Sequence, residues 1–454
     1  MKRNQMASKL ATLLLLTSVL AACASGNNTP EAAAPNDGGG ETPKSETPAA
    51  GSSETIEIRY PWWGSVARHE KYNKLMDMFE AENPGIKVIR EPGSWNDYWD
   101  KLPTQTAGGN APDVLMYTTV GQMPEYADKG AVVPLDDYFA SGAIDVSNIP
   151  KNVLELGKYK GKTYMVTKGL AALSLTTNVG LLKEKGAPLP KESYATWDEF
   201  IAWAKEAQAL LGKNDKGMDI YVIEDDAVDD LMLESYMRLY DKNLFNAEGT
   251  GFGFTKQDLI GYFNLWQSMV KEGIVPPAEI TAEEGELQWE QDMLANRRVV
   301  MSGRPGNHLK VIMGYMDDEL TLTRIPGGNG KFGEVLTGAF LGISSQSKHP
   351  DAVAKLINMW LNDQEFNNLY MNEHGIVQNT QILEKLEMSP GDQATTKNMQ
   401  AVIASTTPQA PRIPGVAGIF TQIETSYQEI NFGRKTVEEA VDDIFAEAER
   451  ILKK

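Results

Sequence analysis

Few residues of this chain have the types and spacing that catalysis requires. No HExxH or other paired-ligand spacing joins the four histidines, His69, His308, His349 and His374, so we expect no metal site. No GxSxG elbow is present, and the chain has a single cysteine, Cys23. The sequence therefore predicts a protein that is not an enzyme and that uses no cofactor.

Two further patterns carry weak chemical signals. Residues 327–331 (GGNGK) look like part of a phosphate loop, but Phe332 stands where such a loop needs Ser or Thr, so a surface turn is the preferred interpretation. Adjacent carboxylates such as Glu283-Glu284 and Asp225-Asp226 could serve a glycosidase, which needs two acids beside one bond. Adjacent acids in polar stretches are usually solvated, which disfavours that interpretation.

Aromatic residues stand where a ligand could lie. Trp62 and Trp63 follow the first predicted strand, Trp95 opens a predicted helix, and Tyr117 ends the third predicted strand. Open α/β sheets bind ligands at the carboxyl ends of their strands, and flat rings suit the C–H-rich faces of sugars. Because tryptophan is also a common core residue, we expect four others to be packing residues on helices: Trp197, Trp203, Trp266 and Trp360. For Trp62, Trp63, Trp95 and Trp289, core packing and ligand contact both remain open.

Hydrophobic periodicity predicts the elements that position these rings. The pattern favours strands at residues 55–60, 86–89 and 113–117, and helices at residues 67–81 and 95–106. This β-α-β-α-β order predicts an α/β fold with a parallel sheet covered by helices on both faces. Further along the chain, helices are predicted after capping boxes at Thr196 and Thr436 and after His349-Pro350.

The first residues have the order of a secretion signal. Lys2, Arg3 and Lys9 accompany an apolar stretch at residues 10–20, which is about half of the ~20 residues that a membrane span needs. Ala21-Ala22 then precede Cys23, a pattern that resembles the bacterial lipobox, in which the cysteine receives a diacylglyceryl group and begins the mature chain. We therefore expect a signal peptide at residues 1–22 and a lipid on Cys23. The protein would be anchored to the extracytoplasmic face of the cell membrane.

Composition separates a tether from a folded body. Residues 23–53 are rich in Gly, Pro, Ser and Thr and contain no aliphatic side chain larger than alanine, which predicts a disordered tether. The body from residue 54 onward is longer than one hydrophobic core usually supports, so we expect two lobes. The net charge of −19 makes nucleic acid an unexpected partner.

Five stretches together resemble a known family. They are residues 111–127 (APDV followed by GQMPEYA), 172–178 (ALSLTTN), 297–303 (RRVVMSG), 338–343 (GAFLGI) and 433–440 (GRKTVEEA). In order and spacing the chain is similar to the extracellular solute-binding proteins (family 1) of the carbohydrate class that feed ABC importers, the group that includes maltose-binding protein. The resemblance implies an α/β periplasmic-binding-protein-like fold, with two lobes joined by a hinge and a ligand cleft between them. Lobe 1 would comprise residues 54–168 plus 338–378, and lobe 2 residues 169–337 plus 379–454.

The resemblance also implies a mechanism and a site. A sugar that contacts both lobes would favour the closed state, which an ABC permease would accept; we expect a monomer that makes no chemical change to its ligand. From lobe 1 we expect ligand contacts from Trp62, Trp63, Trp95, Thr118 and Thr119, with Tyr117 just beneath them. From lobe 2 we expect Trp289, Arg304, Asn307, His308 and Phe420. The family often has a ring-stacking tryptophan after Gly303; this chain has none there, and His308 or Phe420 would substitute.

Alternatives remain open from the sequence alone. A secreted glycan-active enzyme would release reducing ends, whereas a binding protein would return its ligand unchanged. A receptor lipoprotein of the same fold would signal to a sensor. A peptide-binding relative is the nearest competitor among binding proteins, since the many aromatic residues disfavour only a small anion.

Overall fold

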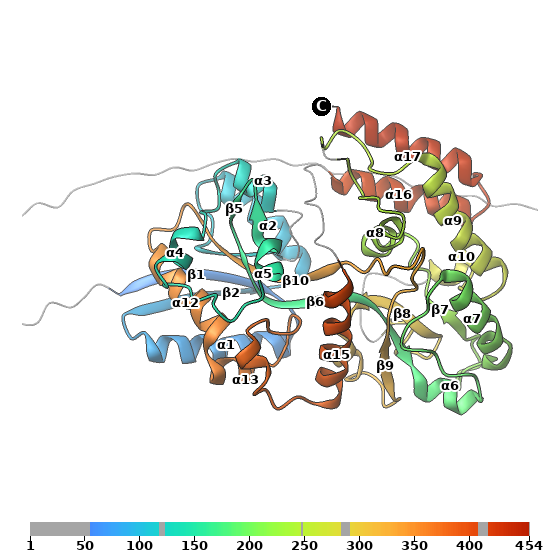
Figure 1. Ribbon diagram of the computed structural model, residues 1–454, viewed down its shortest axis with the longest axis horizontal. Helices are drawn as coiled ribbons and strands as arrows, with labels where there is room; N and C mark the ends of the chain where they lie inside the picture. Colours follow the sequence, from blue (N-terminus) through green and yellow to red (C-terminus); the bar gives the residue numbers. More distant parts are fainter. Residues whose placement is uncertain (1–54, 118–122, 247, 283–290, 407–415, 454) are drawn as a thin grey trace, which may run out of the picture. The chain divides into compact units, whose positions relative to one another are not determined.

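Strands and helices alternate at the start of the folded body, as the hydrophobic pattern predicted. The computed structural model describes residues 55–117, 123–246, 248–282, 291–406 and 416–453 (Figure 1). Its first elements are β1 (Ile56–Trp63), α1 (Val66–Glu82), β2 (Ile86–Gly93), α2 (Trp95–Ala107) and β3 (Val114–Tyr117). Strand β1 pairs with β2 in parallel, so the predicted order is confirmed in this region.

The central sheet differs from the expected one. It contains β6 (Val166–Asn178), β7 (Tyr221–Ile223), β8 (Val299–Pro305), β9 (Leu320–Thr323) and β10 (Leu336–Ile343), in the order β3-β10-β6-β8-β7, with β9 also pairing with β6. All pairs except β7–β8 are antiparallel. The prediction of a parallel sheet is therefore wrong for this sheet. A local β-α-β pattern fixes the direction of consecutive strands only, whereas β6 and β10 pair across a long stretch of chain.

Helices and short strands complete the α/β fold. They are α3 (Met123–Asp128), α4 (Asp136–Ala140), α5 (Lys151–Leu154), a single 3₁₀ turn η1 (Glu155–Gly157), β4 (Lys158–Tyr159), β5 (Lys162–Thr163), α6 (Val179–Lys185), α7 (Trp197–Leu211), α8 (Asp230–Arg238), α9 (Lys256–Lys271), α10 (Ala278–Thr281), α11 (His308–Ile312), α12 (Pro350–Asn362), α13 (Gln364–Tyr370), α14 (Thr380–Leu383), α15 (Pro390–Ser405), α16 (Val416–Asn431) and α17 (Val437–Leu452). None of the helices in the described ranges is long and apolar enough to cross a membrane.

Caps explain where several helices begin. Ser94 and Asp97 form a reciprocal capping box that starts α2 and fixes Trp95 in its first turn. Thr436 and Glu439 do the same for α17, as predicted. At α7 only half of the predicted box forms. The Thr196 hydroxyl accepts a hydrogen bond from the Glu199 amide, but the Glu199 carboxylate accepts from the amide of Ala195.

Two main hydrophobic clusters form the core, and strand β6 contributes to both. Its Leu170 and Ala172 belong to the first cluster, with side chains of β1, α1, β3, β10 and α12. Its Leu173 and Leu175 belong to the second, with side chains of α7, α8, α9, α16 and α17. The first cluster also includes Met399 and Val402 of α15, a helix inside the segment 379–454 that we assigned to lobe 2. The division of the chain into lobes remains a prediction.

Glycines allow the backbone to cross tightly beside β6. Gly375 has φ +104, and a Cβ placed there would lie 2.3 Å from the carbonyl oxygen of Leu170. The amides of Leu170 and Ile376 each donate to the carbonyl of the other residue, at 2.9 and 2.7 Å. A Cβ on Gly338 of β10 would lie 2.2 Å from the carbonyl oxygen of Gly169. Three chain segments thus meet where β6 passes from the first cluster to the second.

Candidate ligand-binding site

An aromatic wall stands at the carboxyl end of β1 and the start of α2. The ring of Trp63 packs edge-on against Trp95 and Tyr98, with centroids 5.2 and 4.8 Å apart, and lies 5.8 Å from Trp99. Trp95 is 47% exposed, whereas Trp63 is only 6% exposed. Trp63 also meets the His374 ring at 5.7 Å. We call Trp63, Trp95, Tyr98 and Trp99 the aromatic wall. Its exposed face is the indole of Trp95.

Trp62 and Tyr117 do not contribute to the face of this wall. Trp62 is fully buried between Tyr60 and Tyr72, and its Nε1 donates to Nδ1 of His69 at 3.2 Å. Tyr117 is also fully buried and packs against Tyr126, and burial raises the pKa of its hydroxyl well above the usual range. Both residues support the site from beneath, and neither offers a ring face to a ligand in this conformation.

A group of charged side chains lies beside the wall. Glu373 accepts from Arg68 Nε at 3.1 Å and from Lys71 Nζ at 2.6 Å, and these three side chains are between 12 and 24% exposed. Arg68 and Lys71 stand three residues apart on α1, so both reach the same side of the helix. The two cations lower the pKa of the Glu373 carboxyl against the opposing effect of burial. The carboxylate of Glu373 therefore forms ion pairs with two cations.

Arg304 on β8 is held in a buried ion-pair network. Its guanidinium donates to Asp292 at 2.5 Å, to Glu224 at 3.0 Å and to the hydroxyl of Ser302 at 2.8 Å. The side chain of Arg304 is 8% exposed and that of Asp292 is 2% exposed. These carboxylates raise the pKa of Arg304 although burial opposes them. The contacts give Arg304 a structural role in joining three segments of the chain, and leave few N–H groups for a ligand.

The other predicted contacts from the second half of the chain are partly buried. Asn307 stands at the N-cap of α11 without a side-chain capping bond. Desolvation lowers the pKa of His308 to about 3, and Arg304 and Arg68 add to this effect, so His308 is neutral at physiological pH. Phe420 on α16 packs against the second hydrophobic cluster. The structure thus brings Trp63 and Trp95 together and sets His308 within the electrostatic influence of Arg68.

Several predicted positions lie outside the described residues. They are Cys23, Thr118, Thr119 and Trp289, together with the predicted signal and tether. Among the described residues, no group of three or more His, Cys, Asp or Glu is placed to hold a metal ion.

A cavity of about 330 Å³ adjoins the aromatic wall. It lies at the carboxyl ends of β1 and β2 beside α2, and Tyr98 belongs to both the cavity and the wall. Trp62 also belongs to the lining of the cavity, although it is fully buried. Glu91, Asp97 and Lys101 add polar groups to its lining. Its size is at the lower end of the range for small-molecule sites, which is about 300–1,000 Å³. Rings and polar groups therefore occur together at this edge of the sheet.

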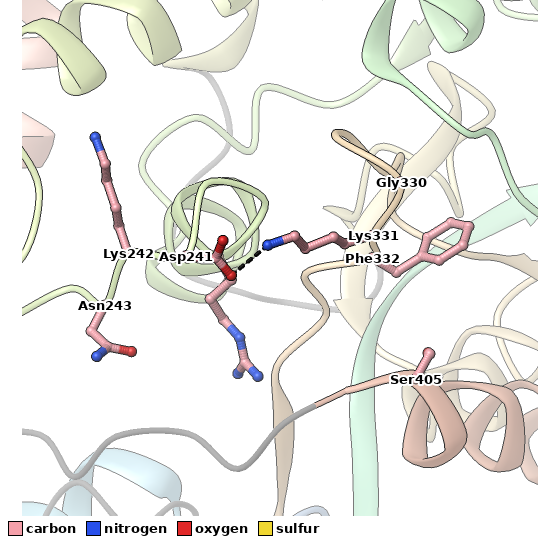
Figure 2. A pocket seen from close by; sticks show the side chains of 8 residues that line it. Asp241, Lys242, Asn243, Gly330, Lys331, Phe332 and Ser405 are labelled. Atoms are coloured by element: carbon pink, nitrogen blue, oxygen red, sulfur yellow. Dashed lines mark ion pairs between the residues drawn. The ribbon is translucent and has the colours of Figure 1, made fainter.

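A larger cavity of about 470 Å³ lies elsewhere, between the end of α8 and the GGNGK turn (Figure 2). The predicted surface turn is confirmed, since the amide of Gly328 donates to Lys331 and the Lys331 amide donates back. Lys331 pairs with Asp241 across the cavity. Its one ring, Phe332, is covered by the guanidinium of Arg324, whose central carbon lies 3.9 Å from the ring centroid. None of the predicted contact residues that the structure describes lines this cavity, so we assign the candidate site to the aromatic wall.

Sequence reasoning missed Trp99, Tyr98 and the charged group. A signal for Trp99 was present, because it stands four residues after Trp95 on a predicted helix and therefore shares its face. No local pattern pointed to Glu373 or His374, which follow α13 and reach α1 only in the folded chain.

Comparison with known proteins identifies the class. The model of the bacterial extracellular solute-binding protein family matches residues 74–389, and the chain belongs to this family. A putative binding protein of Brucella abortus is 28% identical over 233 residues, 50% of this chain and 53% of the relative. The chain thus spans about half the length of the curated relatives that it matches.

Solved structures of similar fold cover nearly all of the folded body. A periplasmic oligogalacturonide-binding protein from Yersinia enterocolitica, in complex with saturated digalacturonic acid, is 22% identical with a TM-score of 0.74. An ABC substrate-binding protein from Listeria monocytogenes, in complex with cycloalternan, is 20% identical with a TM-score of 0.73. Each match covers 88% of this chain and 99% of the other. At these identities the likeness shows the fold, which is the two-lobed α/β fold of periplasmic-binding-protein type.

Proposed function

We propose that this protein is the substrate-binding lipoprotein of an ABC importer, which captures a sugar or oligosaccharide outside the cell and delivers it to the permease. The aromatic wall carries this proposal. An indole that is 47% exposed, backed by three further rings at the carboxyl end of a strand, is a surface suited to the C–H face of a pyranose. One part of the Trp95 ring packs against Trp63 and Trp99, and the exposed part is available to a ligand.

Polar groups near the wall would orient the sugar. Lys101 and Asp97 on α2 and Glu91 on β2 line the cavity beside Tyr98, and charged groups can bind hydroxyls through charge-assisted hydrogen bonds. The ligands of the two solved relatives, a digalacturonic acid and a cycloalternan, are both carbohydrates. These two complexes support a carbohydrate as the ligand of this protein.

Closure of the two lobes around the sugar would be the conformational change that accompanies binding. Strand β6 contributes to both hydrophobic clusters, and the backbone crossing at Gly169, Gly338 and Gly375 has little side-chain bulk. Both features support a hinge in this region. A sugar that contacts both lobes binds the closed state more tightly and so shifts the population toward it. Asn307, His308, Phe420 and Trp289 remain candidates from the second lobe, and Thr118 and Thr119 remain candidates from the first. The ion pairs of Arg304 favour a structural role for that residue.

The anchor is proposed from the sequence. Acylation of Cys23 would hold the tether at the membrane and leave the body free to meet sugars and the permease. Mass spectrometry of the mature protein tests this, because Cys23→Ser is expected to lose both the added lipid and the membrane fraction.

A saccharide panel tests the sugar assignment. Binding of a ligand at about 100 times its Kd stabilises the native state by about 2.7 kcal/mol, which thermal unfolding and tryptophan fluorescence would detect. The recovered ligand should carry no new reducing ends; their appearance would favour a glycan-active enzyme. A peptide that stabilises the protein when no saccharide does would overturn the proposal.

A further inference from the structure

One of the two ring nitrogens of His374 is hydrogen-bonded to a side chain of the protein core. Its Nδ1 lies 2.6 Å from the hydroxyl of Tyr72, and that hydroxyl lies 2.6 Å from Nζ of Lys168. Tyr72 and Lys168 are essentially inaccessible, and His374 is 7% exposed. The three side chains form a chain of hydrogen bonds that runs from β6 through α1 to the segment after α13.

Lys168 sets the direction of this chain when it carries its proton. Nζ of Lys168 has three contacts for its hydrogens: the hydroxyls of Tyr60 at 3.1 Å and Tyr72 at 2.6 Å, and the sulfur of Met116 at 3.3 Å. Burial lowers the pKa of Lys168 well below its usual value, whereas the rings of Trp360 and Tyr72, with centroids 4.2 and 4.6 Å from Nζ, favour the protonated form. A lysine ammonium only donates, so the Tyr72 oxygen accepts from it and the Tyr72 hydrogen is left for Nδ1 of His374.

If Nδ1 of His374 accepts the Tyr72 hydrogen, the other ring nitrogen, Nε2, is a buried hydrogen-bond donor. An imidazole that accepts at Nδ1 and is neutral carries its hydrogen on Nε2. Nε2 of His374 has no hydrogen-bond partner among the described residues, although it is buried. An unsatisfied buried N–H is costly, and the bond from Tyr72 strengthens Nε2–H as a donor by polarising the ring. The two nitrogens lie on different edges of the ring, so Nε2–H is not directed at Tyr72, while the His374 ring abuts Trp63 of the aromatic wall.

Charge near His374 is predominantly positive. Arg68 and Lys71 share the carboxylate of Glu373. Burial lowers the pKa of His374 well below its usual value, and the charges of Arg68, Lys168 and Lys71, with His308, lower it further. The two cations Arg68 and Lys71 against one carboxylate form a local excess of positive charge in a chain of net charge −19.

We propose that Nε2–H of His374 donates to a carboxylate oxygen of the bound sugar, so that the ligand of this protein is an acidic saccharide of the uronic acid type. The proposal rests on the proposed function. A carboxylate supplies the acceptor that the buried donor lacks, and its negative charge balances the excess of cations beside it. A neutral sugar could satisfy the donor with a hydroxyl, but would leave the positive charge uncompensated.

Matched ligands separate this inference from the proposed function. Digalacturonate and neutral galactobiose differ in the oxidation of C6, so calorimetric titration with both measures the contribution of the carboxylate. We expect digalacturonate to bind at least tenfold more tightly, with affinity that falls as salt increases. Equal or tighter binding of galactobiose would overturn the inference and leave the sugar assignment intact. Failure of both ligands and of a wider panel of uronates and neutral saccharides would overturn both.

The variant His374→Asn tests the residue. The Oδ1 of Asn occupies nearly the place of Nδ1 and can still accept from Tyr72, whereas nothing replaces Nε2–H. We expect digalacturonate affinity to fall by about ten- to a hundredfold, as for the loss of a hydrogen bond to a charged group. The matched control is His349→Asn at the N-cap of α12, which should bind as the parent protein does. Unchanged affinity in His374→Asn would overturn the role of His374.

A measurement on the unmodified protein does not depend on the folding of a variant. Nitrogen-15 spectra of histidine distinguish the two neutral tautomers, and we expect His374 to carry its hydrogen on Nε2 and to shift when digalacturonate binds. A hydrogen on Nδ1, or a signal that digalacturonate does not shift, would contradict the proposal.

Discussion

Arg304→Met is the perturbation that best distinguishes a structural from a ligand-binding arginine. In the structure the guanidinium donates to Asp292, Glu224 and Ser302, which belong to three separate parts of the chain. Methionine keeps much of the aliphatic volume and removes the charge. Two carboxylates, with side chains 2 and 17% exposed, would then lose their cation.

The expected cost follows from this burial. Breaking a buried ion pair by removing one partner costs about 3–5 kcal/mol, mostly because the remaining charge stays buried. We place Arg304→Met in this range for the free energy of unfolding. Asp292→Asn added to Arg304→Met should recover part of the loss, because the amide carries no charge. Arg450→Met is the control: Arg450 is 58% exposed and pairs with Glu447 at the surface, so its loss should leave the free energy of unfolding nearly unchanged.

Urea unfolding at 25 °C, followed by tryptophan fluorescence, measures these differences by linear extrapolation. The same variants are titrated with the best sugar of the panel. We expect a less stable protein whose folded fraction still binds with nearly the parent affinity. A variant within about 1 kcal/mol of the parent stability that has lost sugar affinity would refute the structural assignment and return Arg304 to the list of ligand contacts.

Three other outcomes are expected. Burial raises the pKa of Asp225 from 3.8 to about 6, so between these values the folded protein keeps a proton that the unfolded chain releases. The free energy of unfolding relative to Asp225→Asn should therefore fall by about 2 kcal/mol from pH 4 to pH 6 and level off above about pH 7. A difference independent of pH in urea titrations would contradict this. Gly375→Ala should lower the free energy of unfolding by about 2–5 kcal/mol in the same assay, because the new Cβ would meet a carbonyl oxygen of β6. Gly433→Ala, where φ is +66 and the space is open, should lower it by about 1–2 kcal/mol. Equal losses of stability in the two variants would argue against the close crossing. Trp95→Ala should weaken sugar binding about tenfold in calorimetry at unchanged stability. Trp62→Ala should instead lower the free energy of unfolding by about 3–5 kcal/mol in urea. The reverse pattern would move the site to Trp62.

Local signals were sufficient to predict the first strands and helices. The alternation at residues 55–60, the breaker after α1 and the polar caps act over a few residues, and the structure confirms the elements that they predict. The four tryptophans expected on helices as packing residues are also confirmed, with Trp266 and Trp360 almost fully buried. Helical spacing defines a buried face without knowledge of the partner.

The candidate site was predicted less completely. Trp62 and Trp63 were both expected to line the ligand, although successive strand residues face opposite sides of a sheet, and the structure places Trp62 beneath α1 and Trp63 against α2. Glu224 lies 80 residues from Arg304 in the sequence, so no local pattern could show that the arginine is paired. The direction of the central strands was missed for the same reason, since long-range pairing decides it.

The shared strand β6 has a consequence for how this protein acquires its structure during synthesis. A growing chain that has reached residue 335 contains β6 but lacks β10, α12 and α13, all of which supply side chains to the first cluster. The amino-terminal half must therefore stay incomplete, with apolar surface exposed, until much of the carboxyl-terminal half has emerged. Such a wait favours slow maturation and dependence on chaperones, and early truncations should yield insoluble fragments.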